Sequence, residues 1–301
     1  MSVPISAASG ERCRLAPLRT GGFLHRRARP GRTAAAWRLA TLPLMMLIAS
    51  GPAFADRDVV SLDFCADQYV LHLLPRSRIL ALSPDARAGF SHLRNAAQGL
   101  PLVRPAAEDV IALGPDVVVR SYGGGHGSLE FFERSGIEVV QIPHAQDLGE
   151  VRAAVLEVAA ALGVRHRGLA VVALMDRRLA AVRQAPGRAS ALYLTPGGAT
   201  SGPGTLVHEI LGAAGLGNYE QRAGWHAIPL ERLAYEDPDV VVYSTFGNAS
   251  EQTAWWSSMR HPVARRQLSA TRAIRIAGDT TACAGWFVLD AIEELAAATA
   301  R

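Results

Sequence analysis

The chain has 301 residues, of which 49% are hydrophobic, so it can bury one large core or two modest ones. Its formal net charge is +4, and all of its basic residues are Arg. Residues 1–55 contain eight Arg and one acidic residue, whereas residues 56–301 contain 23 Arg and 26 acidic residues. The body of the chain therefore has no excess positive charge, which argues against a nucleic-acid partner.

Residues 1–55 are organised like a signal peptide. An Arg-rich segment precedes the apolar run 39–50, which is too short to span a bilayer comfortably. Ala53-Phe54-Ala55 then provides a small-residue cleavage site before Asp56. We expect cleavage there and a periplasmic protein; the alternative is an uncleaved membrane anchor.

From residue 58 onwards, short apolar strand patterns alternate with helix patterns. In the first half of this region, strands are predicted at 59–62, 78–83, 117–119 and 138–142, and helices at 66–74, 108–113 and 129–135. A Gly-rich turn, 123–127, lies between a strand and a helix. Alternation of this kind predicts a parallel sheet covered by helices.

The stretch 147–184 contains no Pro and reads as helix almost throughout. Apolar residues recur at spacings of three and four in both of its halves, and Gly163 marks a break between them. The second helix, about 20 residues, would span roughly 30 Å. We predict that residues 164–187 link two lobes.

After this stretch the alternation begins again. Strands are predicted at 191–195, 240–242 and 273–276, and helices at 205–213, 230–235 and 287–300, with a turn at 196–204. The fold class expected for the whole chain is α/β, with two similar parallel-sheet lobes joined by a single long α-helix and a ligand cleft between them. The N-terminal lobe is predicted at 56–163 and the C-terminal lobe at 188–301.

An internal repeat supports the two-lobed plan. Residues 108–119 (EDVIALGPDVVV) match residues 231–242 (ERLAYEDPDVVV): in both segments Glu precedes Pro by seven residues, and Pro-Asp leads into three valines. The copies lie on either side of the predicted linking helix. They predict one common lobe plan and a ligand pocket at the interface between the lobes.

Two cysteines, Cys65 and Cys283, remain once the leader is removed. In an exported protein they form either a disulfide or two buried free thiols. Neither has the C-x-x-C spacing of a metal or redox site.

In the order and spacing of these features, residues 58–300 resemble the substrate-binding proteins of ABC importers, of the class with a rigid helical linker that takes up cobalamin, iron–siderophore complexes and haem. The resemblance is strongest at 59–62 with Cys65, at the two repeat segments, along the linking helix and at 206–218 (LVHEILGAAGLGN). It implies a non-enzymatic, monomeric periplasmic receptor. Its partners would be a metal chelate (siderophore, corrinoid or haem) and an ABC permease dimer with its ATPase.

The resemblance also implies roles for particular residues. Glu108 and Glu231 occupy the positions of the glutamates that dock onto the permease. Trp225, six residues before Glu231, stands where the cobalamin-binding members have a Trp that lines the ligand cleft. The equivalent position in the first lobe holds Leu102 and departs from the pattern of the cobalamin-binding members.

Other cleft candidates follow from their places in the sequence. They are the aromatic residues Tyr122, Phe246 and Trp286, and Arg87, Arg104 and Arg120, which could pair with acidic groups of a ligand.

The motifs of other functions are missing from the sequence. The Gly-rich turn fits neither phosphate-binding fingerprint, and there is no G-x-S-x-G elbow and no H-E-x-x-H pair. We therefore predict no catalytic residues, no metal site and no cofactor. The alternatives are an exported α/β enzyme or a metal-ion receptor that uses the same cleft.

Overall fold

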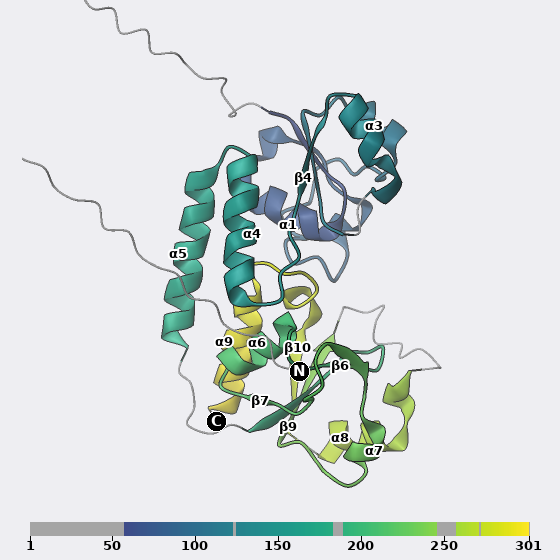
Figure 1. Ribbon diagram of the computed structural model, residues 1–301, viewed down its shortest axis with the longest axis vertical. Helices are drawn as coiled ribbons and strands as arrows, with labels where there is room; N and C mark the ends of the chain where they lie inside the picture. Colours follow the sequence, from purple (N-terminus) through teal and green to yellow (C-terminus); the bar gives the residue numbers. More distant parts are fainter. Residues whose placement is uncertain (1–56, 123–124, 183–188, 246–256, 271, 301) are drawn as a thin grey trace, which may run out of the picture. The chain divides into compact units, whose positions relative to one another are not determined.

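The computed structural model describes residues 57–122, 125–182, 189–245, 257–270 and 272–300 (Figure 1). All of them lie within one compact unit, residues 50–301. None of the helices in this described part meets the length and hydrophobicity that a membrane span requires.

The first half of the unit contains a four-stranded parallel sheet in the order β2-β1-β3-β4. Its strands are β1 (Val59–Ser61), β2 (Ile79–Ala81), β3 (Val117–Arg120) and β4 (Glu138–Gln141). The helices that accompany it are α1 (Phe64–Leu73), α2 (Ala107–Ile111) and α3 (Leu129–Arg134). The central strands β1 and β3 are buried along their whole length, as expected for a parallel sheet covered on both faces.

The second half contains another four-stranded parallel sheet, in the order β10-β9-β5-β7. Its strands are β5 (Ser190–Leu194), β7 (Gly217–Asn218), β9 (Val240–Thr245) and β10 (Arg272–Ala277). The helices are α6 (Leu206–Ala213), α7 (Leu230–Leu233), α8 (Pro262–Ala270) and α9 (Val288–Thr299). Read from β7, this order repeats the order of the first sheet, so the prediction of two similar parallel-sheet lobes is confirmed.

The Pro-Asp step of the internal repeat has the same structural role in both sheets. The Asp116 carboxylate accepts a hydrogen bond of 2.7 Å from the backbone N–H of Asp58, just before β1. The Asp239 carboxylate accepts one of 2.7 Å from the N–H of Ser190, the first residue of β5. Each Asp thus ties the start of one central strand to the start of its neighbour, and the three valines that follow fill the core.

One pairing was not predicted. Strand β6 (Ala199–Ser201) pairs antiparallel with β8 (Trp225–Ala227), in a segment where the sequence predicted only a turn, 196–204. Gly, Ser and Pro dominate that segment and obscure the strand pattern, and its partner lies more than twenty residues further along the chain. The pair holds Trp225 at a fixed place in the second lobe.

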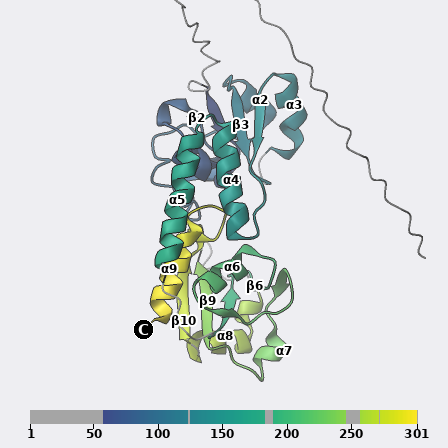
Figure 2. The ribbon, with the colours of Figure 1, turned by 60° about the vertical axis from the view of Figure 1, so that its left-hand side comes forward.

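Helices α4 (Leu148–Ala161) and α5 (Arg165–Ala181) run side by side (Figure 2). Gly163 lies between them with a φ of 72°, a left-handed conformation that favours glycine. Near its start, α5 donates from Arg167 to the backbone carbonyl of Leu73 in α1. Near its end, Arg178 forms ion pairs with Asp290 and Glu293 of α9. Helix α5 therefore contacts elements of both lobes.

The close packing of α4 on α5 depends on Gly168. A Cβ atom at this position would lie 2.5 Å from the Ala159 Cβ and 3.2 Å from the Val155 carbonyl oxygen. We predict that Gly168→Ala lowers the free energy of unfolding by about 1–3 kcal/mol, because the helices must move apart, as measured by urea denaturation.

The matched control is Gly212→Ala in α6, where an added Cβ meets no atom within 4 Å. We expect it to stabilise the protein by about 0.5–1 kcal/mol. Equal stabilisation by both substitutions would show that α4 and α5 are not in close contact.

Candidate functional site

A cavity of about 640 Å³ is bordered by residues of both lobes. Its lining comes from the start of α1, the segments that follow β3 and β4, the start of α6, the residues around β8 and the segment before α9. The lining residues are Cys65, Tyr69, Ser121, Tyr122, Gln141, Ile142, Pro143, His144, Ala145, Gln146, Gly204, Thr205, Leu206, Val207, Ile210, Gly224, Trp225, Thr281, Ala282, Cys283 and Ala284. The carboxyl ends of parallel strands are the usual site of ligand binding in α/β folds.

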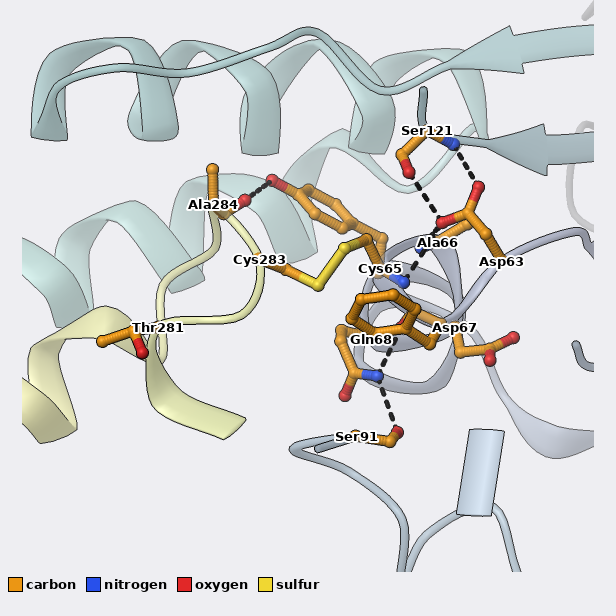
Figure 3. The surroundings of a disulfide bond; sticks show 12 residues. Asp63, Cys65, Ala66, Asp67, Gln68, Ser91, Ser121, Thr281, Cys283 and Ala284 are labelled. Carbon is orange, nitrogen blue, oxygen red and sulfur yellow. Dashed lines mark hydrogen bonds between the residues drawn. A yellow bond between two sulfur atoms is a disulfide. The ribbon is translucent and has the colours of Figure 1, made fainter. Parts of the chain in front are cut away.

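A disulfide between Cys65 and Cys283 forms part of the cavity wall (Figure 3). It joins the first turn of α1 in the first lobe to the segment before α9 in the second. Beside it, the Tyr69 hydroxyl donates a hydrogen bond of 2.9 Å to the carbonyl of Ala284. The sequence left open whether the two cysteines are bridged; in the structure they are.

Further contacts extend this junction between the lobes. The His92 ring stacks on Phe287, with centroids 4.6 Å apart, and its Nε2 lies 3.6 Å from an Asp290 carboxylate oxygen. Arg94 forms an ion pair with Asp279. One side of the interface is therefore fastened by covalent, aromatic and charged contacts.

Asp63 holds the first-lobe wall of the cavity in place (Figure 3). Its carboxylate caps α1 by accepting from the backbone N–H groups of Cys65 and Ala66, at 3.1 and 2.9 Å. It also accepts from the backbone N–H and the hydroxyl of Ser121, at 2.6 and 2.7 Å. This one side chain thus fixes the segment after β3, which bears Tyr122, against the helix that bears Cys65. We did not single out Asp63 from the sequence, although an Asp between a strand and a helix is a typical N-cap.

Two of the predicted aromatic residues lie at the cavity. Tyr122 and Trp225 both line it, with 71% and 54% of their surface exposed. The Trp225 ring contacts the buried Tyr193 edge to face, with centroids 6.1 Å apart. Large exposed aromatic side chains on opposite lobes can hold a planar or bulky ligand between them.

Of the other two aromatic candidates, only Trp286 lies within the described residues, and it does not line the cavity. Trp286 is buried in the core, where its ring stacks on His72 at 4.3 Å and meets Tyr69 edge to face at 5.5 Å. Phe246 lies outside the described residues.

None of the three Arg candidates lines the cavity. Arg87 donates to the backbone carbonyls of Ala97 and Leu100. Arg104 is paired with Asp109 at 2.7 Å, and Arg120 is buried and donates to the carbonyl of Ser121. Their positions in the sequence did not reveal these local partners.

The polar residues at the cavity are mainly ones that the sequence did not mark. Gln141 ends β4, His144 and Gln146 follow it, and Thr205 and Thr281 come from the second lobe. Only their place after strand ends could have indicated them. Among the described residues, no three His, Cys, Asp or Glu side chains converge in a way that could hold a metal ion.

Asp67, one helical turn after Asp63, serves the fold rather than the cavity. It accepts hydrogen bonds from the backbone N–H and the hydroxyl of Ser83, at 3.0 and 2.6 Å. Burial raises the pKa of this carboxyl to about 7, although the hydrogen bonds from Ser83 oppose the increase. The side chain ties α1 to the segment after β2.

The comparison with protein families identifies the fold. The model of a family described as periplasmic binding protein matches residues 95–275, which is more than half of the chain. The chain belongs to this family. It is accordingly a solute-binding component of a transport system and not an enzyme.

Solved structures show the same fold at low sequence identity. The periplasmic haem-binding protein HutB of Vibrio cholerae has a TM-score of 0.66 and 17% identity, covering 80% of this chain and 98% of its own. The apo form of the haem-binding protein RhuT from Roseiflexus sp. RS-1 has a TM-score of 0.64 and 20% identity, covering 81% and 97%.

A third similar structure is described as an ABC-type Fe3+-hydroxamate transport system from Saccharomonospora viridis, with a TM-score of 0.61 and 19% identity, covering 82% of this chain and 94% of its own. None of the curated proteins compared with the chain matches it.

The disulfide gives a direct prediction. It closes a loop with a sequence separation of 218 residues, which restricts the unfolded chain strongly. The double variant Cys65→Ala/Cys283→Ala should lose about 2–5 kcal/mol of unfolding free energy in urea denaturation.

A reductant serves as the control. It should lower the stability of the native protein to that of the double variant and leave the variant unchanged. Identical unfolding of the native protein with and without reductant would show that the bond is not formed.

Proposed function

We propose that this protein is the periplasmic receptor of an ABC uptake system for a metal chelate of the iron–siderophore or cobalamin type. It binds the chelate between its lobes and delivers it to a permease dimer with its ATPase. The observation that supports this most strongly is the cavity at the carboxyl ends of both sheets, with Tyr122 on one lobe and Trp225 on the other. Several proteins with this fold are described by the haem or Fe3+-hydroxamate that they bind or transport.

The remaining parts of the proposal concern export and domain organisation. Residues 1–55 act as the cleaved signal peptide, and the mature protein functions as a monomer in the periplasm. The lobes span residues 56–163 and 188–301, and residues 164–187 link them. Because α5 contacts both lobes and the disulfide fastens the junction, lobe motion on ligand binding is small.

Tryptophan fluorescence tests ligand capture. We predict that cyanocobalamin, a ferric siderophore or haem changes the emission of the protein purified from periplasm, because Trp225 lines the cavity. Trp225→Phe should remove most of the change, whereas Trp286→Phe, in the core, should retain it. If no chelate of the panel alters the emission or binds by calorimetry, the proposed function is wrong.

Permease docking is assigned to Glu108 and Glu231. Both side chains are exposed, each in the first turn of a short helix, α2 or α7, and neither lines the cavity. The two helices hold equivalent places in the two lobes, each preceding the central strand β3 or β9. Two separated carboxylates that meet fixed cations on a partner set orientation and register more than raw affinity.

The docking proposal separates transport from binding. We predict that Glu108→Ala/Glu231→Ala reduces cellular uptake at least about tenfold while the chelate affinity stays within about twofold, because charged rim contacts act on the encounter of the partners. Glu133→Ala, an exposed Glu of α3, serves as the control and should leave uptake unchanged. Loss of chelate affinity in the double variant would instead place these residues in ligand binding.

A further inference from the structure

We infer that the ligand is an uncharged metal chelate whose periphery presents amide or hydroxamate groups, and not an anionic one such as haem or a ferric catecholate. This inference rests on the proposed function, since it specifies the class of chelate that the cavity takes. The observation that leads to it is the charge of the cavity wall.

The described lining residues include no Arg, Asp or Glu, and the chain has no Lys. Their only titratable side chains outside the disulfide are Tyr69, Tyr122 and His144. Tyr69 is buried and donates to the carbonyl of Ala284, and burial raises its pKa, so it stays neutral.

The cations nearest in sequence to the lining are already engaged. Arg120 donates to the carbonyl of Ser121, and Arg222 is paired with Glu220 at 2.8 Å. The pairing raises the pKa of Arg222 and lowers that of Glu220, as expected for two charges that stabilise each other. Neither Arg is a lining residue.

The helix N-termini at the cavity supply partial charges at most, and two of the three are capped by a carboxylate. A helix N-terminus attracts anions through its free N–H groups and its dipole. Here Asp63 caps α1 and Asp147 caps α4, where its carboxylate accepts from the N–H of Glu150 at 2.7 Å. Each of these two ends thus has a carboxylate of its own, which offsets the dipole. The third, α6, is capped by the neutral Thr205.

An anionic ligand would lose its hydration in this cavity without gaining an Arg or Lys partner from the described lining residues. Burying a charge without a partner costs free energy. The propionates of haem and the charged oxygens of a ferric catecholate would therefore weaken binding in this cavity. Neutral amide and hydroxamate groups instead match the side-chain amides of Gln141 and Gln146, which line the cavity. Corrinoids and ferric hydroxamates share this neutral periphery, and both offer apolar surface to Tyr122 and Trp225.

The test is calorimetric titration of the protein purified from periplasm with cyanocobalamin, ferrichrome, haem and ferric enterobactin. We expect cyanocobalamin or ferrichrome to bind at least about tenfold more tightly than either anionic chelate, and the two neutral arms distinguish a corrinoid from a hydroxamate. Tighter binding of haem or ferric enterobactin would overturn this inference while leaving the proposed function intact. Binding of none of the four would overturn both.

A charge-introducing variant gives an independent readout. Gln141→Arg places a cation at the cavity and should increase the affinity for haem or ferric enterobactin about tenfold, an effect that high salt reduces. Gln98→Arg, the same substitution at an exposed position outside the lining, is the matched control and should change neither affinity. Circular dichroism establishes that both variants are folded. Unchanged anion affinity in folded Gln141→Arg would contradict a cavity whose charge selects the ligand.

Discussion

The bond between Cys65 and Cys283 is the constraint on which the geometry of the site depends. It fixes the first turn of α1 against the segment before α9, and the hydrogen bond from Tyr69 to Ala284 and the stack of His92 on Phe287 reinforce the same junction. Helix α5 adds a second connection through its contacts with α1 and α9. Tyr122 and Trp225 line the same cavity as the bridged cysteines, so these contacts fix the two walls that the aromatic side chains belong to.

The order of the elements followed from local sequence patterns. Valine-rich runs after Pro-Asp predicted the central strands β3 and β9. The repeat predicted two lobes of one plan, because strands and helices that pack in the same way need apolar residues at the same spacing. The structure adds the reason for the spacing that the two copies share. Asp116 and Asp239 each accept a hydrogen bond from the backbone at the start of the neighbouring strand. What could not be predicted was the β6–β8 pair, since pairing between distant short segments depends on the tertiary fold and leaves no periodic pattern in a Gly-rich stretch.

The site was predictable only where position along the chain determines position in space. Tyr122 and Trp225 follow or flank strand ends, and both line the cavity. The Arg side chains behaved differently because a long, flexible side chain takes whichever partner lies within reach: Arg104 pairs with Asp109, and Arg87 turns back onto backbone carbonyls. His144 and the glutamines beside it have no distinctive spacing. Their role emerges only when the segment after β4 is placed opposite the second lobe.

The distribution of charge separates the two tasks of a receptor. A neutral cavity holds its ligand by apolar contact and neutral hydrogen bonds, which salt screens little, so capture should depend weakly on ionic strength. The proposed docking residues, Glu108 and Glu231, are exposed carboxylates away from the cavity, and their contacts with a membrane partner would be screened by salt. Binding and delivery thereby rest on different physical interactions. Because the described lining residues include no Arg, Asp or Glu, a change in the docking carboxylates can leave ligand capture intact.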